Sequence, residues 1–388
     1  MTTDRYDAIV VGAGPSGSTA ARELAAGGAR VLLMDRAKFP RDKPCGGGLT
    51  IRASRLMPPG YEGVIEQTVY AARFSYKQKP SFERRSEQAL TYMTQRRHLD
   101  LFLAESAERA GAVFHDGERT DSIERSGDGV LVRTASSLYR CSLLVGADGA
   151  NGVVARAVGL TPRYTAWVAL EGNASDGESV RQWRDTIGID VGSVPGGYGW
   201  LFAKGEHVNV GVGGWETIAA DLRGLLERVS RFYGLSADRL ENLKGHALPI
   251  RRPGSPVIGD GVMLVGDAAA LVDPLSGEGI HSALLSGTLS AEAGLRFLST
   301  GNGLGRYQDG IESDLGKDLL FSRKLQKLFQ LTPRLYLSIV KRSPRVWLKL
   351  EQLVRGEAGY DTIRRDSKIL GPLLEAAGTL IPEMGLRR

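Results

Sequence analysis

Three glycines and an aspartate near the beginning of the chain have the spacing of a nucleotide-binding turn. Gly12-x-Gly14-x-x-Gly17 follows one apolar stretch, and Asp35 closes the next. The first glycine permits a tight turn from strand to helix, the second lets the backbone approach a pyrophosphate, and the third lets helix and strand pack closely. An acid at the end of the second strand can bind ribose hydroxyls. We therefore predict that Gly12, Gly14, Gly17, Asp35 and the adjacent Arg36 bind a dinucleotide.

Two later apolar stretches also end in an aspartate. Asp148 is followed by Gly149, and Asp267 is followed by a segment that leads into a helical pattern. An acid in this position can accept hydrogen bonds from ribityl hydroxyls, and free N–H groups at a helix start can face the carbonyl end of a flavin. We therefore predict FAD as the cofactor, with a second group of binding residues: Asp148, Gly149, Asp267, Pro274, Gly277, Gly279 and Ile280.

A loop of one cysteine and three glycines could lie against a large planar ligand, because glycine lets the backbone approach closely. We predict that Cys45, Gly46, Gly47 and Gly48 contact FAD. Cys45 is also a candidate catalytic residue, as a proton donor or as a group that tunes the flavin. The alternative is that it is only a small residue in a tight loop. With 2 cysteines in the chain, a repeated metal-binding spacing is excluded, and we expect no metal site.

Three aromatic residues alternate in a strand-like segment at 198–202. Tyr198, Trp200 and Phe202 would project from the same face of a strand, where they would form a flat apolar wall. Such a wall suits an isoprenoid chain, so we predict that these residues bind substrate, with Tyr198 as a second candidate catalytic residue. The alternative is that they belong to an ordinary sheet core.

These residues need an α/β fold to bring them together. Apolar strands ending at Asp35, Asp148 and Asp267 are typical of one nucleotide-binding domain, and alternating segments such as 208–212 indicate an antiparallel sheet inserted in it. The expected architecture is a Rossmann-like FAD-binding domain with an inserted antiparallel-sheet substrate domain and a C-terminal helical segment. We expect the FAD-binding domain at 1–60, 96–162 and 253–309, the substrate domain at 61–95 and 163–252, and the helical segment at 310–388.

Positive charge is concentrated at the end of the chain. The 388 residues carry a net charge of +6, yet residues 1–320 have a net charge of −2 and residues 321–388 one of +8. A local excess of this kind favours an anionic membrane surface or an acidic partner over nucleic acid. No uncharged apolar run reaches the ~18 residues of a spanning helix. We expect a cytoplasmic protein with peripheral contact at the inner face of the membrane. The oligomeric state stays open.

The combined motifs resemble the FAD fold shared by aromatic hydroxylases, flavin halogenases and geranylgeranyl reductases. The resemblance covers about residues 1–300, and it implies that Arg96, at the start of a helix, lies beside FAD, with Arg97 as the alternative. The KxCGGG loop and the aromatic strand are similar to those of the geranylgeranyl reductase family. Ala203 departs from that family, in which a proline is usual. The tryptophan-rich segment of a halogenase is replaced here by GYGWLFA.

The resemblance implies a reductase that saturates C=C double bonds of a prenyl chain on a lipid or isoprenoid. Its electron donor stays open between NADPH and a reduced carrier such as ferredoxin. One alternative is an FAD-dependent monooxygenase of an aromatic or polyketide-like substrate. Another is a non-enzymatic prenyl-binding escort, which the intact phosphate turn disfavours.

Overall fold

A computed structural model describes residues 3–127 and 129–359 of the chain. Its first sheet contains the predicted nucleotide-binding strands. In order across the sheet, β17, β18, β11, β1, β2 and β8 are neighbours, and β10 joins β11 and β9 as an antiparallel extension. The strands are β1 (Thr3–Val11), β2 (Val31–Asp35), β8 (Val113–Asp116), β9 (Thr120–Ser126), β10 (Gly129–Thr134), β11 (Leu138–Gly146), β17 (Ile258–Gly259) and β18 (Val262–Leu264).

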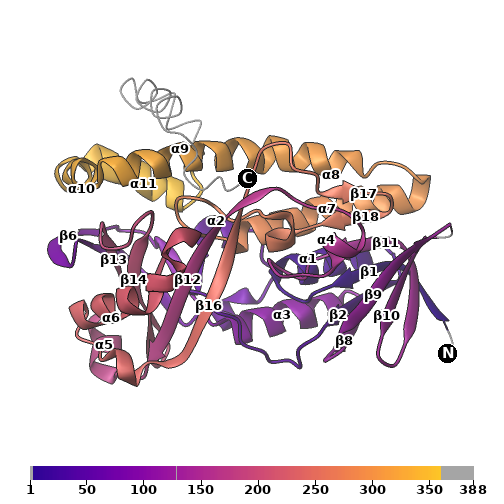
Figure 1. Cartoon of the computed structure of the whole chain (residues 1–388), viewed down its shortest axis with the longest axis horizontal. Helices are drawn as coiled ribbons and strands as arrows, with labels where there is room; N and C mark the ends of the chain where they lie inside the picture. Colours follow the sequence, from indigo (N-terminus) through magenta and orange to yellow (C-terminus); the bar gives the residue numbers. More distant parts are fainter. Residues whose placement is uncertain (1–2, 128, 360–388) are drawn as a thin grey trace.

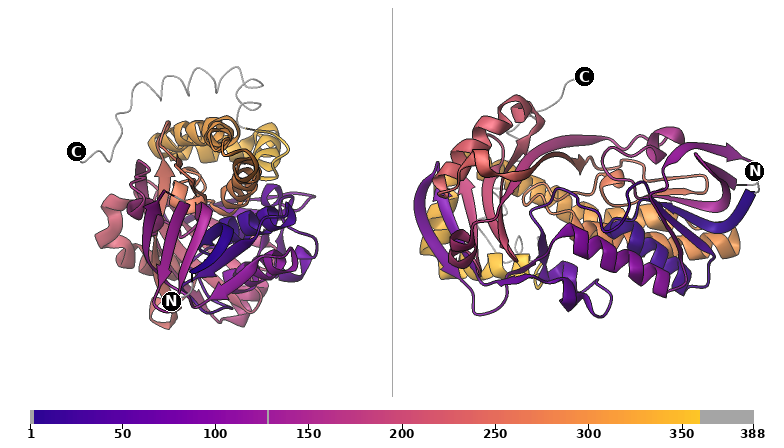
Figure 2. Two further views of the ribbon diagram at one scale, coloured as in Figure 1. Left: turned by 90° about the vertical axis from the view of Figure 1, so that its right-hand side faces the viewer. Right: turned by 90° about the horizontal axis from the view of Figure 1, so that it is seen from below.

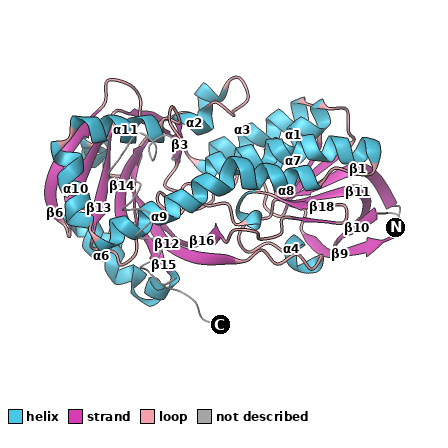
Figure 3. Ribbon diagram, turned by 90° about the horizontal axis from the view of Figure 1, so that it is seen from above, coloured by secondary structure: helices cyan, strands magenta, loops and turns pink. Residues whose placement is uncertain are grey.

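Three helices pack side by side over the parallel part of this sheet (Figure 3). They are α1 (Pro15–Ala26), α3 (Arg96–Arg109) and α7 (Ile280–Thr300). Close approach of α1 and α7 depends on Gly287, whose missing Cβ would lie 2.6 Å from the Ser16 carbonyl oxygen. Parallel strands covered by helices place their carboxyl ends at one edge, where ligands bind in folds of this type. The structure confirms the predicted α/β fold class.

A second sheet stands at the other end of the elongated molecule (Figure 2). Its order is β16, β12, β15, β14, β13, β5, β6, and all pairs are antiparallel except β13 with β5. It therefore takes strands from two separate parts of the sequence. They are β5 (Ala71–Tyr76), β6 (Lys79–Arg85), β12 (Tyr164–Ala174), β13 (Thr186–Val191), β14 (Tyr198–Lys204), β15 (His207–Trp215) and β16 (Glu241–Arg251).

The two faces of the second sheet differ because side chains alternate along each strand. On one face, Val208, Val210 and Val212 are buried together with Leu225 and Val229. The last two belong to α6 (Leu222–Phe232), which covers that face with α5 (Gly177–Gln182). The opposite face carries small and aromatic side chains and faces a cavity.

Short elements connect the two sheets. A small antiparallel sheet contains β3, β7 and β4, and the short helix α2 lies next to it, whereas the short helix α4 lies next to β9 of the first sheet. These elements are β3 (Gly48–Thr50), β4 (Gln67–Val69), β7 (Thr91–Met93), α2 (Ile51–Ser54) and α4 (Val154–Ala157). Because β3 begins at Gly48, the glycine loop is anchored directly to this small sheet.

The C-terminal helices run along the molecule from the first sheet to the second (Figure 1). They are α8 (Gly305–Gly310), a π-helical segment (Ile311–Gly316), α9 (Lys317–Leu331), α10 (Pro333–Arg342) and α11 (Pro344–Val354). Prolines begin α10 and α11, as expected for a residue without a backbone N–H. Arg84 of β6 donates to the Val340 carbonyl oxygen at 3.1 Å and so ties α10 to the second sheet.

Residues 360–388 of the predicted helical segment 310–388 lie outside the described residues. In the part of the chain that is described, none of the helices combines the length and the apolar character needed to cross a membrane.

Candidate functional site

The phosphate turn lies between β1 and α1, and its glycines are required by the geometry. Gly12 has φ +105°, and a Cβ there would lie 2.3 Å from the Ala147 carbonyl oxygen. A Cβ on Gly17 would lie 1.8 Å from the Gly12 carbonyl oxygen. Asp35 accepts a hydrogen bond from the Ala13 N–H at 2.9 Å, which fixes the turn against β2. No side chain caps the N-terminus of α1, so its N–H groups remain free for phosphate oxygens.

Two arginines lie beside this turn. A Cβ on Gly14 would lie 3.6 Å from Arg41 Nη2 and 3.8 Å from Arg96 Nη2. Arg96 donates two hydrogen bonds of 2.7 Å to Asp100, and Arg41 lies 2.8 Å from the same carboxylate. Burial lowers the pKa of Arg96, but Asp100 outweighs this effect and raises the pKa above its usual range. Asp100 therefore holds both guanidinium groups in place next to the turn, whereas Arg97 is exposed.

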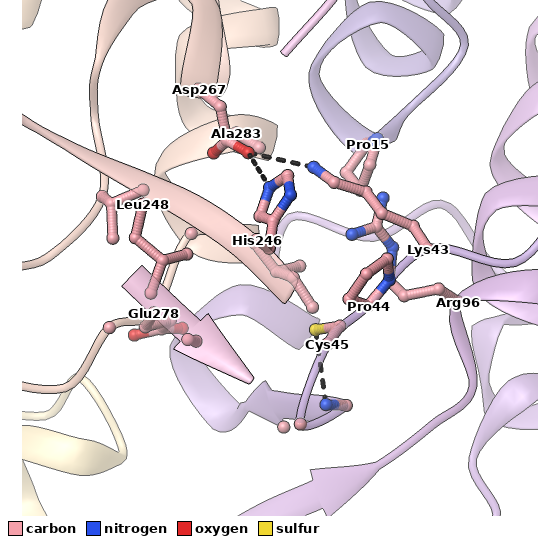
Figure 4. A pocket seen from close by; sticks show the side chains of 18 of the residues that line it. Pro15, Lys43, Pro44, Cys45, Arg96, His246, Leu248, Asp267, Glu278 and Ala283 are labelled. Atoms are coloured by element: carbon pink, nitrogen blue, oxygen red, sulfur yellow. Dashed lines mark hydrogen bonds and ion pairs between the residues drawn. The ribbon is translucent and has the colours of Figure 1, made fainter. Parts of the chain in front are cut away.

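An ion-paired cluster lies farther along the cavity (Figure 4). Lys43 Nζ lies 2.9 Å from Asp267 Oδ2, and His246 Nε2 lies 3.7 Å from the same oxygen. Burial raises the pKa of Asp267, but Lys43 and His246 outweigh it and hold the pKa well below its usual range. Asp267 is thus an ionised acceptor that faces the cavity at the end of β18. Asp148 has a different environment, since its carboxylate accepts from the Val153 and Val154 N–H groups at the start of α4.

The glycine loop is held between the two sheets. The Cys45 N–H donates to Glu171 Oε1 at 2.7 Å, and Lys204 Nζ donates to the Cys45 carbonyl oxygen at 2.7 Å. Gly47 has φ +80°, and a Cβ there would lie 2.2 Å from the Thr94 carbonyl oxygen. A Cβ on Gly46 would lie 2.9 Å from the Phe202 ring. The loop therefore fits tightly between β14 and β7, and a side chain at either glycine would displace it.

The segment before α7 forms the opposite side of the cavity. Glu278 accepts from Thr50 and from Arg52, each at 2.6 Å. Burial raises the pKa of Glu278, but Arg52 outweighs it and holds the pKa below its usual value. The Tyr198 hydroxyl donates to the Ser276 carbonyl oxygen, so the aromatic strand is joined to this segment. No side chain caps the N-terminus of α7, which leaves its first N–H groups available to a ligand.

The aromatic residues of β14 form one wall of the cavity. The ring centroids of Tyr198 and Trp200 are 5.9 Å apart, and those of Trp200 and Phe202 are 6.2 Å apart. Gly211 on β15 lies opposite Trp200, and a Cβ on it would lie 2.1 Å from the indole ring. The Trp200 ring therefore lies flat over a glycine. Trp200 Nε1 donates to Asn209 at 2.8 Å, which fixes the orientation of the ring.

One continuous cavity of about 950 Å³ contains these groups. It extends from the phosphate turn, past the glycine loop and the aromatic wall, to the inner side of the C-terminal helices. The side chains from those helices that line it are Phe329, Tyr336, Trp347, Leu350, Glu351, Leu353 and Val354. The C-terminal helices thus close the cavity at the end that is distant from the nucleotide turn.

Most of the residues singled out from the sequence lie around this cavity. Two of them do not line it: Gly17 lies behind the turn, and Pro274 lies beside the lining residues. The residues that line the cavity are Gly12, Gly14, Asp35, Arg36, Cys45, Gly46, Gly47, Gly48, Arg96, Asp148, Gly149, Tyr198, Trp200, Phe202, Asp267, Gly277, Gly279 and Ile280. Sequence reasoning missed Arg41, Lys43, Glu171, Lys204 and His246. Only Lys43 carried a sequence signal, as the lysine of KxCGGG. In the described residues no cluster of His, Cys, Asp and Glu could hold a metal ion.

The site has the groups that FAD requires. The open space beside Gly14, flanked by two fixed guanidinium groups, fits a pyrophosphate, and the carboxylates of Asp35 and Asp267 could accept hydrogen bonds from sugar hydroxyls. A family model described as an FAD binding domain matches residues 5–175. The fold and the site define an FAD-dependent oxidoreductase. When FAD is bound, it supplies hydride chemistry.

Comparison with known proteins narrows this class. A menaquinone reductase from Mycobacterium tuberculosis is 34% identical over 319 residues, which cover 74% of this chain and 76% of that protein. Digeranylgeranylglycerophospholipid reductase 2 from Methanothermobacter thermautotrophicus is 30% identical over 346 residues, 84% of this chain and 88% of that protein. The chain belongs to the geranylgeranyl reductase family of FAD-dependent oxidoreductases.

A solved structure has the same fold. The geranylgeranyl bacteriochlorophyll reductase-like protein from Thermoplasma acidophilum superposes with a TM-score of 0.79 at 24% identity, covering 96% of this chain and 100% of that one.

Proposed function

We propose that this protein saturates C=C double bonds in the prenyl chain of a lipid or isoprenoid. The observation that carries the proposal is the long apolar cavity, which joins the FAD site to the C-terminal helices along the wall of Tyr198, Trp200 and Phe202. A flexible isoprenoid chain can fill such a space, and contact with rigid aromatic rings would hold one double bond in a reactive orientation.

Positioning is the main requirement of this chemistry, because an isolated double bond is a poor hydride acceptor. The apolar lining would exclude water from the reacting carbons, and the loop of Cys45 and three glycines would let the flavin and the chain approach closely. Binding energy along the whole chain would then serve to align a single bond.

The named relatives suggest two classes of head group. One acts on menaquinone and the other on a digeranylgeranylglycerophospholipid, according to their names. For this chain we propose a prenyl substrate with a quinone or a glycerophospholipid head.

The test is an anaerobic incubation of the dithionite-reduced protein with menaquinone and with digeranylgeranylglycerophospholipid. After any quinol has been reoxidised in air, mass spectrometry should find at least one of the two lipids with a prenyl chain heavier by two hydrogens per reduced bond. No gain of hydrogen in the prenyl chain of either lipid contradicts the proposal. A product that gains oxygen, formed only in air with NAD(P)H, supports the alternative of a monooxygenase.

We also propose that the outer side of α10 and α11 rests on an anionic membrane surface. Leu335 is 58% exposed, Leu348 52% and Ile339 43%, although all are large apolar residues. A depression of about 310 Å³ beside them is lined by Arg334, Lys341 and Arg342 together with Tyr76, Leu337 and Ser338. Exposed leucines among cations are typical of helices that lie in the membrane interface. The inner side of the same helices lines the cavity, which would give a membrane lipid a short path to it.

Vesicle sedimentation tests this contact. Each cation near an anionic surface contributes about 1 kcal/mol, so changing Arg334, Lys341 and Arg342 to Gln should lower binding to phosphatidylserine vesicles about 100-fold. A matched control changes the three exposed arginines of α6, which lie on the other side of the sheet: Arg223, Arg228 and Arg231. Equal binding of the native protein to neutral and anionic vesicles contradicts the proposal.

A further inference from the structure

We infer that Glu171 is the acid that gives the proton to the prenyl double bond. This inference rests on the proposed function and adds the group that completes the reaction. Reduction of C=C requires a hydride at one carbon and a proton at the other. The cofactor class accounts for the hydride, and the proton must come from the protein or from water.

The sheet register places Glu171 on the floor of the cavity. Glu171 on β12 pairs with Gly211 on β15, and Gly211 pairs with Trp200 on β14. Residues directly opposite in antiparallel strands project from the same face. Glu171, Gly211 and Trp200 therefore form a row across three strands on the face that lines the cavity. Because Gly211 has no side chain, nothing from that position separates the carboxyl group from the aromatic wall.

Glu171 is also adjacent to the loop that is expected to contact FAD. Its Oε1 accepts the Cys45 N–H at 2.7 Å, while Lys204 holds the carbonyl oxygen of the same residue at 2.7 Å. Glu171 is 9% exposed and Lys204 is 4% exposed. A carboxyl group in this position lies between the predicted cofactor loop and the substrate wall, which is where a proton donor to the alkene must lie.

Its surroundings differ from those of three ion-paired carboxyl groups in the cavity. Asp148 is also bound by backbone N–H groups, but these belong to Val153 and Val154 at the start of α4, away from the glycine loop. Asp35 lies 3.5 Å from Arg41, Asp267 lies 2.9 Å from Lys43, and Glu278 lies 2.6 Å from Arg52. The ion pairs of Asp267 and Glu278 lower the pKa of each carboxyl group and favour its ionised form. In the described part of the chain Glu171 makes no ion pair within 4.0 Å, and its hydrogen-bond partners are the neutral Cys45 N–H and the Asn209 side chain.

Several groups face Glu171 and set its protonation. They are Lys204 of β14, Lys244 of β16, Asp42, which lies 3.2 Å from Lys244, the Cys45 backbone N–H and the Asn209 side chain. Burial raises the pKa of Glu171, and although Lys204 and the Cys45 N–H lower it, the pKa stays above the usual value. A buried carboxyl group with a raised pKa can be a general acid near neutral pH. An ordinary thiol, with a pKa of about 8.5, is a weaker acid than an ordinary glutamic acid at about 4.3.

The proposed step balances. The O–H bond of the Glu171 carboxyl group breaks, and a C–H bond forms at one alkene carbon. A hydride supplied by reduced FAD adds to the other carbon, so the alkene is reduced by two electrons and FAD is oxidised. An external two-electron donor restores the reduced FAD. The new carboxylate is stabilised by the Cys45 N–H and the nearby Lys204 ammonium, and it recovers a proton from water.

The test compares Glu171→Gln, Glu171→Asp and Cys45→Ala in the intact FAD-loaded protein. Glutamine keeps an oxygen that can accept the Cys45 N–H but has no acidic proton. In anaerobic single turnover with the prenyl lipid that the native protein reduces, we expect E171Q to be slowed about 100-fold or more, in the range of general acid catalysis. C45A should be slowed less than about 10-fold, because a cavity residue that is not the donor contributes only packing.

Three further readouts separate a proton donor from a residue that merely positions the loop. FAD content and the visible flavin spectrum should be unchanged in E171Q. The infrared band of a protonated carboxyl group should be present in the native protein and absent from E171Q. The native rate should be highest at low pH and fall as pH rises through the pKa of Glu171. This fall should occur at a different pH in E171D and should be absent from E171Q.

Defined results overturn the inference. They are a native-like single-turnover rate in E171Q, a fall of rate at the native pH in E171D, or a larger decrease of the single-turnover rate in C45A than in E171Q. Failure of the native protein to reduce any prenyl lipid refutes the proposed function instead. If E171Q does not retain FAD, the pH profile of E171D and the infrared band of the native protein still decide the question.

Discussion

Two glycines on the cavity floor provide a matched pair of variants that tests the aromatic wall. A Cβ on Gly211 would lie 2.1 Å from Trp200 Cζ2 and 2.5 Å from Cε2. A Cβ on Gly213 would meet Ala169 Cβ and Trp200 Cζ3 at 3.5 Å, which is ordinary contact. Gly211→Ala must therefore displace the indole ring, whereas Gly213→Ala adds a methyl group to the same floor without a clash.

The expected magnitudes follow from these distances. Carbon atoms pack at about 3.5–4.0 Å, so the Trp200 ring must move by about 1.5 Å in G211A. Overpacking of this kind costs about 1–3 kcal/mol. Displacement also breaks the 2.8 Å hydrogen bond from Trp200 Nε1 to Asn209, worth about 0.5–1.5 kcal/mol. For G213A we expect unchanged or slightly increased stability, because alanine restricts the unfolded chain more than glycine does.

Two measurements check this prediction. The free energy of unfolding in urea should fall in G211A and stay at the native value or above in G213A. With the prenyl substrate, kcat/KM of G211A should fall at least about 10-fold, equivalent to about 1.4 kcal/mol of lost alignment. Equal stability and equal kcat/KM in the two variants would refute the reasoning that Trp200 is held against the strand by Gly211.

Three other predictions concern the polar groups of the site. Arg96→Gln should raise the Kd of FAD at least about 10-fold in a fluorescence titration, because a buried charge-assisted pair is lost. Lys43→Met should lower the free energy of unfolding at neutral pH. The difference from the native protein should shrink as pH falls and Asp267 becomes protonated, because stabilisation from a depressed pKa is lost in acid. Urea unfolding at a series of pH values measures this difference. Tyr198→Phe removes the hydrogen bond to Ser276 and should cost about 0.5–1.5 kcal/mol in unfolding free energy, with single-turnover rates within about 10-fold of native, because the hydroxyl already donates to a backbone carbonyl.

Local patterns in the sequence were sufficient for the nucleotide-binding part of the fold. The glycine spacing before α1 and the acids at the ends of β2, β11 and β18 depend on neighbours in sequence, and the conformations they require are local. The face shared by Tyr198, Trp200 and Phe202 follows from the two-residue period of a strand in the same way.

The buried ionic groups could not be predicted in this way. Glu171 and Lys204 lie in strands whose partners are decided by long-range pairing, and their common contact is the backbone of Cys45, more than 100 residues away in the sequence. Nothing in the local pattern of a charged residue shows that its neighbours will exclude water. The parallel pairing of β13 with β5 was missed for the same reason.

The packing of the C-terminal helices also could not be predicted from the sequence. The sequence predicted a helical segment here, but both sides of these helices carry apolar residues. Trp347 and Leu350 line the cavity, while Leu335 and Leu348 are exposed. Periodicity predicts an apolar side for a helix and does not tell which of two apolar sides packs on the protein.

The most direct test of the central claim is the stoichiometry of one anaerobic turnover. The protein is reduced with one equivalent of dithionite, mixed with a prenyl lipid in the absence of oxygen, and followed by flavin absorbance and product mass together. We predict that each FAD reoxidised yields one saturated C=C bond. Reduced flavin that persists in the presence of menaquinone and of digeranylgeranylglycerophospholipid, and is reoxidised only when oxygen is admitted, would contradict the account.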